Sequence, residues 1–108
     1  MKRFGEELQG VNDMGLWDFQ AALLDNGTLR ILGSNDFAYY HVLEIEFHDV
    51  RFTDVPADFS HAQFRVGDDD GEEVTVWITG ESMTEPSRTE FEVRAAALTV
   101  RIERVPNI

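Results

Sequence analysis

The chain has 108 residues, no cysteine, and 21 acidic against 9 basic side chains, which gives a formal net charge of −12. This charge disfavours direct binding to nucleic acid or to an anionic membrane, because both are recognised through a positive surface. No apolar run approaches the roughly 20 residues of a membrane span, and the N-terminal residues lack the apolar stretch of a secretory signal. We expect one acidic domain, residues 1–108, in the cytoplasm.

Residues 1–14 carry a helical signal. Phe4, Leu8 and Val11 recur at near-helical spacing, which predicts a short helix over residues 2–9. Two glycines weaken that helix, so a flexible N-terminal segment is the alternative.

Strand patterns dominate the rest of the chain, because apolar and polar residues alternate along it. They predict an all-β fold: a curved, mostly antiparallel meander of six or seven strands, arranged as a half-barrel or a sandwich. The expected strands are residues 15–24, 28–34, 39–55, 60–67, 73–80 and 88–105.

The first hairpin turns at an Asp-Asn-Gly sequence. A three-residue loop with Gly27 in the left-handed conformation pairs Leu23 with Leu29 and Ala21 with Ile31. That register sets the apolar side chains of both strands on one face, whereas a two-residue turn would set them on opposite faces. We therefore expect the three-residue loop.

The run GDDDGEE, residues 67–73, is predicted by the same test to be a hairpin tip. Pairing Val66 with Val74 and Phe64 with Val76 aligns the flanking apolar residues and leaves residues 69–71 as the loop. A calcium loop is disfavoured, because its spacing would require ligands from Val66 and Trp77. The solvated tip carries Asp68, Asp69, Asp70, Glu72 and Glu73.

The alternation slips by one residue in each of the two longest strands, near residues 48–49 and at residues 96–97. Such slips are typical of bulges, which bend and twist a strand. Val50 and Phe52 are then expected to continue the apolar face. An open curved sheet would have two edges, one of them protected by charges. These charged residues are Glu90, Glu92, Arg94, Arg101 and Glu103.

No catalytic or metal-binding pattern stands out. The sequence lacks a nucleophile elbow and a glycine-rich phosphate loop. His41 and His48 have opposite strand parity and should point apart. We expect no enzyme, no cofactor and no metal.

Trp77 faces away from the core by strand parity, opposite Gln63 and beside Arg65 and Thr75. Three interpretations remain open at this point. Trp77 forms a cation–π pair on a solvated face, anchors a protein partner, or lies under a second sheet.

Two segments, LEIEFHDVRFTDVP (residues 43–56) and FEVRAAALTVRIERV (residues 91–105), resemble those of small, uncharacterised bacterial β-rich proteins. Some of those families are grouped with the immunity proteins of polymorphic toxin systems. The resemblance implies an acidic cytoplasmic protein that neutralises a toxin by binding it. No motif matches position by position, so no family site is carried over.

We expect a non-enzymatic protein-binding domain whose acidic surface attracts a basic protein. The tip residues and Trp77 would make the contacts. The most specific form of this hypothesis is an immunity-like inhibitor of a basic toxin. One alternative is a carrier of a small ligand, bound in a pocket lined by Phe47, Phe64 and Phe91. The other is a structural subunit that forms a homodimer or larger homo-oligomer through an exposed strand or the Trp77 face.

Overall fold

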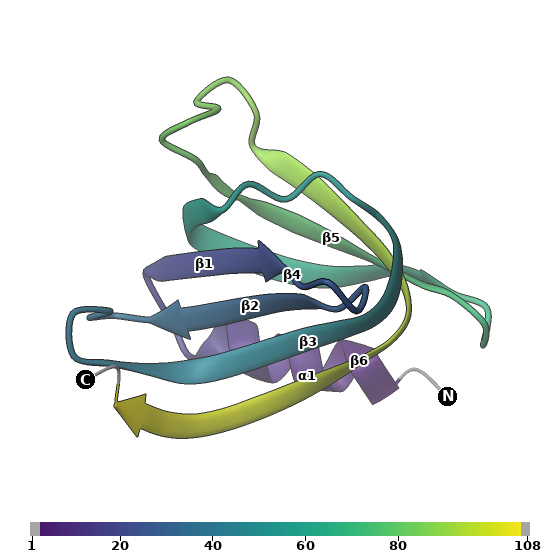
Figure 1. Cartoon of the computed structure of the whole chain (residues 1–108), viewed down its shortest axis with the longest axis horizontal. Helices are drawn as coiled ribbons and strands as arrows, with labels where there is room; N and C mark the ends of the chain where they lie inside the picture. Colours follow the sequence, from purple (N-terminus) through teal and green to yellow (C-terminus); the bar gives the residue numbers. More distant parts are fainter. Residues whose placement is uncertain (1–2, 107–108) are drawn as a thin grey trace.

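The computed structural model describes residues 3–106, in which one helix precedes six strands (Figure 1). The all-β class and the short N-terminal helix are confirmed, and each predicted strand is present within a few residues of its expected ends. The helix continues to Asp13, and Lys2, its predicted first residue, lies outside the described residues. The elements are α1 (Arg3–Asp13), β1 (Asp18–Leu23), β2 (Leu29–Ser34), β3 (Tyr40–Thr53), β4 (Asp58–Asp69), β5 (Val74–Glu81) and β6 (Glu90–Pro106).

The strands of residues 3–106 close into a barrel in the order β1-β2-β3-β6-β5-β4, with β4 paired to β1. Because β4 returns beside β1 after three consecutive strands, the arrangement is a Greek key. The curved antiparallel sheet is therefore present, and it closes on itself. β6 lies between β3 and β5, so the expectation that its charged residues protect a sheet edge is wrong.

The first hairpin has the predicted register. Leu23 pairs with Leu29 and Ala21 with Ile31, and Gly27 has a φ of 82°. Glycine adopts this left-handed conformation without the steric cost that a Cβ would bring. The side-chain pattern was sufficient to fix this turn.

The predicted register of the second hairpin is wrong by two residues. Val66 pairs with Val76 and Phe64 with Ile78, and the strand shifts at Gly67, between Val66 and Asp68. The loop is shorter than predicted, because the amide of Asp70 donates to the carbonyl of Glu73 at 3.2 Å. A shift of two residues keeps side-chain parity, so the predicted inner and outer faces remain correct. The cross-strand partner of Trp77 is accordingly Arg65, and not Gln63.

Both long strands change phase where predicted, and they do so opposite one another. His48 pairs with Ala97 and Val50 with Ala95, so the pairing stays in register across the break, and Asp49 between them has a φ of 54°. A further register shift follows Val50. It turns Phe52 to the outside of the barrel, where it is 38% exposed, so the prediction that Phe52 continues the apolar face is wrong.

Helix α1 packs against β4, on the side of β4 that β1 leaves unpaired, where Asn12 bonds to the backbone of Phe64. β4 pairs with β1 only through its first residues, 58–60. Leu8 and Val11 of the helix are buried in the core, and burial of such side chains contributes about 1.5–3 kcal/mol each. This packing offsets the unfavourable helix propensity of the glycines, because tertiary contacts usually dominate helical stability.

Candidate partner-binding surface

The acidic run forms the tip of the β4–β5 hairpin, which projects at the right of Figure 1. Its own carboxylates hold the turn. Asp69 Oδ1 accepts from the amide of Gly71 at 3.1 Å, and Asp70 Oδ1 accepts from the amides of Glu72 and Glu73 at 2.9 and 2.8 Å. Side chains of this type commonly stabilise turns by bonding to backbone amides one to three residues ahead.

The hydrogen bonds from the amides of Glu72 and Glu73 lower the pKa of Asp70 below its ordinary value. A carboxylate that accepts backbone hydrogen bonds is favoured in its charged form. The turn therefore keeps a negative charge at its apex into mildly acidic solution.

Arg51 of β3 ties one side of the tip to the barrel. Its guanidinium donates to the carbonyl oxygen of Glu72 at 3.1 Å and forms ion pairs with the carboxylates of Glu73 at 3.5 Å and Asp49 at 3.3 Å. Within residues 3–106, the other four carboxylates of the tip form no ion pair. These are Asp68, Asp69, Asp70 and Glu72.

Trp77 lies on the outer face of the same hairpin and is partly exposed. Its indole ring covers the backbone of Gly67, because a Cβ at that position would overlap the indole Nε1 and Cδ1. The guanidinium carbon of Arg65 is 5.9 Å from the centre of the indole ring, which is within cation–π range. The strands of residues 3–106 form a single closed sheet, so the interpretation that places Trp77 under a second sheet is wrong.

The predicted site residues are therefore brought together on one hairpin. Trp77 covers the bulge at Gly67, and the acidic tip begins at the next residue, Asp68. The tip and the indole ring are therefore neighbours on the β4–β5 hairpin.

The arginines of residues 30–106 are all engaged. Most form ion pairs with carboxylates, while Arg104 packs on the ring of Tyr40 at 4.3 Å. One cluster surrounds Glu44 of β3. Its carboxylate oxygens lie 2.6 Å from Nη2 of Arg101 on β6 and 3.8 Å from Nε of Arg30 on β2. The paired arginines are Arg30, Arg51, Arg65, Arg88, Arg94 and Arg101.

Glu44 shows how such a cluster acts on a carboxyl group. Burial raises the pKa of Glu44, but hydrogen bonds from Arg101 and His41 and the nearby arginine charges outweigh that effect, so its pKa is below the ordinary value. His41 Nε2 lies 3.4 Å from the same carboxylate. The cluster joins three neighbouring strands and is a stabilising feature of the barrel wall.

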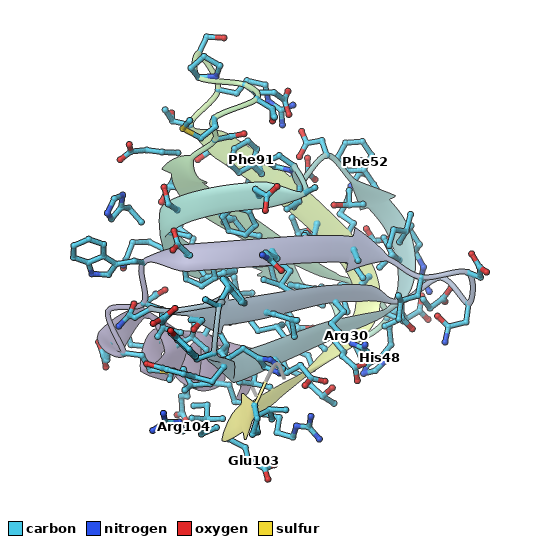
Figure 2. All side chains as sticks on the ribbon, turned by 60° about the vertical axis from the view of Figure 1, so that its left-hand side comes forward. Arg30, His48, Phe52, Phe91, Glu103 and Arg104 are labelled. Atoms are coloured by element: carbon cyan, nitrogen blue, oxygen red, sulfur yellow. The ribbon has the colours of Figure 1, made fainter. Side chains whose placement is uncertain are left out.

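A trough on the outside of β1 is a feature that the sequence patterns did not predict. Three adjoining hollows, of about 470, 360 and 280 Å³, follow the outer surface of β1, its seam with β4 and the loop of residues 82–89. In Figure 2, β1 crosses the front of the barrel with β4 above it, and Arg30 marks the lower side of the trough. Met83, which lines two of the hollows, is strongly exposed, as is Trp17 just before β1.

The barrel interior is filled by side chains. Phe47, Phe64 and Phe91 are all buried in one hydrophobic cluster, and none of the three lines any of the hollows described here. This packing counts against an internal ligand pocket lined by these phenylalanines.

Among residues 3–106, no three acidic or histidine side chains are arranged to hold a metal ion. No helix in the same range has the length and apolar character that a membrane span requires. Comparison of the chain with protein-family models, with curated proteins and with solved structures finds no match.

Proposed function

We propose that the chain is a non-enzymatic module that binds a basic protein through its acidic outer surface. One observation carries this proposal. The arginines of residues 30–106 are engaged, while four carboxylates of the β4–β5 tip form no ion pair with any described residue and lie near a partly exposed Trp77. Unpaired charges of one sign attract an oppositely charged partner and speed its encounter.

Trp77 adds a contact of another kind. Tryptophan is enriched among the residues that dominate binding energy at interfaces, and the ring of Trp77 is held in place over Gly67. A side chain that is already ordered loses little conformational entropy when a partner covers it. The tip would guide the partner, and Trp77 would supply apolar contact.

The sharpest version of the proposal is an immunity-like inhibitor that neutralises a basic toxin in the bacterial cytoplasm. Residues 43–56 and 91–105 resemble segments of small, uncharacterised bacterial β-rich proteins, some of whose families are grouped with immunity proteins, and this resemblance supports it. An acidic inhibitor suits a toxin that binds nucleic acid, because such a toxin needs a positive surface.

An inhibition titration tests this version on the basic protein recovered by affinity capture. The partner's activity should fall in proportion to the added chain and end at a fixed ratio of the two proteins. A partner that stays fully active while saturated with the chain would rule out an inhibitor and leave a binding module of another kind.

A further inference from the structure

The trough beside β1 has an apolar floor and an acidic rim. The floor includes Phe19 and Phe59, whose rings stack with centroids 5.3 Å apart, and Met83, which is 95% exposed, stands at its side. Of the exposed large hydrophobic side chains, Met83 lines the hollow, and Trp17 lies near the same end of β1 through its contact with His61. Grouped apolar surface of this kind is typical of interaction sites.

The acidic rim is produced by strand pairing. Ser60 pairs with Asp18 on β1 and with Glu81 on β5, and Asp58 pairs with Gln20. The carboxylates of Asp18, Asp58 and Glu81 therefore lie on the same outer face around Ser60. Like charges at neighbouring cross-strand positions destabilise a sheet, and a cation placed among them would relieve that repulsion.

Neither Asp18 nor Asp58 forms an ion pair within residues 3–106. Glu81 has a weak partner in His61, whose Nδ1 lies 3.5 Å from the carboxylate. The arginines of residues 30–106 are already engaged with other groups. The chain therefore presents two neighbouring carboxylates beside an apolar hollow. Arg30 lines the same trough, but its guanidinium is paired with Glu46 at 3.1 Å.

His61 lies beside one end of the trough. It has a φ of 53°, in the left-handed region that few residues other than glycine adopt. Its amide donates to the carbonyl of Trp17 at 2.9 Å, and its ring lies 5.6 Å from the Trp17 ring. The contact fixes an exposed indole beside Asp18, where it can stack on a cationic group.

We infer that the trough binds an extended segment of a partner protein, with an arginine or lysine side chain over Asp18 and Asp58 and an apolar side chain against Met83. The inference rests on the proposed function and names the place where the basic partner is held. Three adjoining hollows, which lead from β1 across its seam with β4 to the loop of residues 82–89, suit an extended chain better than a compact small molecule. A second copy of this chain is a poor occupant, because it carries the same net charge of −12 and the arginines of its residues 30–106 are engaged.

The test uses the full chain and a short blocked peptide in which arginine alternates with valine. Amide shifts in nuclear magnetic resonance spectra report where the peptide binds. We expect shifts at residues 17–20, 58–61 and 81–83, and none with the same peptide carrying glutamine in place of arginine. Equal binding of the glutamine peptide would overturn the inference.

Variants show whether peptide binding depends on the carboxylates of the trough or on the net negative charge of the chain. Asp18→Asn with Asp58→Asn should weaken peptide binding roughly tenfold, which corresponds to about 1.4 kcal/mol. Asp13→Asn with Glu103→Gln removes the same charge from other exposed positions and should change binding little. Met83→Gln, at an exposed site that leaves folding intact, should weaken binding without changing charge.

The outcomes distinguish binding in the trough from the proposed function, which is binding of a basic protein anywhere on the acidic surface. Shifts centred on the β4–β5 tip, or an equal loss in both charge variants, would overturn the trough and leave a general acidic partner surface. Failure of the arginine peptide to bind anywhere would contradict the trough and the proposed function together. Trough shifts that depend on protein concentration without peptide would identify a second copy as the occupant and overturn the inference.

Discussion

The indole ring of Trp77 occupies the space above Gly67 that the Cβ of any other residue would need. Glycine at a strand position often marks a close approach of this kind. The same residue marks the register shift between β4 and β5. One glycine therefore sets both the path of the hairpin and the position of the candidate anchor.

Gly67→Ala should move the indole ring and destabilise the fold by about 1 kcal/mol, because added volume at a filled site forces its neighbours to shift. Denaturant unfolding measures the stability. Tryptophan emission in a Trp17→Phe background reports the environment of Trp77 alone. Gly10→Ala is the matched control, since a Cβ there meets open space and alanine favours a helix. Unchanged emission and stability in Gly67→Ala would contradict the close contact.

Asn12 of α1 completes the exposed edge of β4. Its amide nitrogen donates to the carbonyl of Phe64 at 2.8 Å, and its Oδ1 accepts from the Phe64 amide at 2.7 Å. Asn12→Ala removes both bonds from a partly buried backbone and should lower the free energy of unfolding by about 1–3 kcal/mol.

Hydrogen exchange of the Phe64 amide measures this effect directly and should become faster in Asn12→Ala. Gln9→Ala on the exposed side of α1 is the control, because the Gln9 side chain bonds to Asp13 on the helix surface and not to β4. Equal exchange rates in the two variants would mean that Asn12 does not hold the edge.

Glu44→Gln should destabilise the barrel by about 1 kcal/mol at neutral pH, because it removes the charge that holds Arg101, Arg30 and His41 together. The pKa of Glu44 is lower in the folded chain, so its contribution is complete above the ordinary value of 4.5 and is lost as the pH falls through the folded pKa. Unfolding free energies of the native and variant chains should therefore converge in acid. A difference that persists or widens there would contradict this assignment.

The carboxyl group of Asp70 should titrate below the ordinary aspartate value of 3.8, because the amides of Glu72 and Glu73 hold its charged form. The carboxyl carbon resonance, followed against pH, gives the midpoint. A midpoint at or above the ordinary value would show that the turn does not form these hydrogen bonds in solution.

Neutralising the tip with Asp69→Asn, Asp70→Asn and Glu72→Gln should slow association with a basic partner and flatten its dependence on salt, because steering by charge is screened by ions. Stopped-flow measurement of the association rate gives both quantities. Glu6→Gln, Asp13→Asn and Glu103→Gln form the control with the same charge change. Equal slowing in both triple variants would assign the effect to net charge and remove the tip from the site.

The contrast between the two hairpins explains how far the sequence could predict the fold. The alignment of apolar side chains selected the register of Leu23 and Leu29 correctly, because an error of one residue would turn every side chain to the wrong face. The same test could not separate Val66–Val74 from Val66–Val76, because a shift of two residues preserves both faces. Gly67 was the available signal, as a glycine within a strand pattern indicates a bulge.

The candidate site was predictable to a similar degree. The tip carboxylates and the outward direction of Trp77 follow from local pattern, and both are present in the fold. The trough depends on the pairing of β1 with β4 and on the loop of residues 82–89, which local alternation does not encode. The cluster at Glu44 depends in the same way on β2 and β6 being the neighbours of β3.

The most direct test of the central claim is affinity capture from a lysate of the source cells at low salt, eluted with a rising salt gradient and read by mass spectrometry. We predict recovery of one strongly basic protein, released as salt increases and retained poorly by the triple tip variant. Recovery of the chain alone, or of a partner held equally at high salt, would contradict binding driven by the acidic surface.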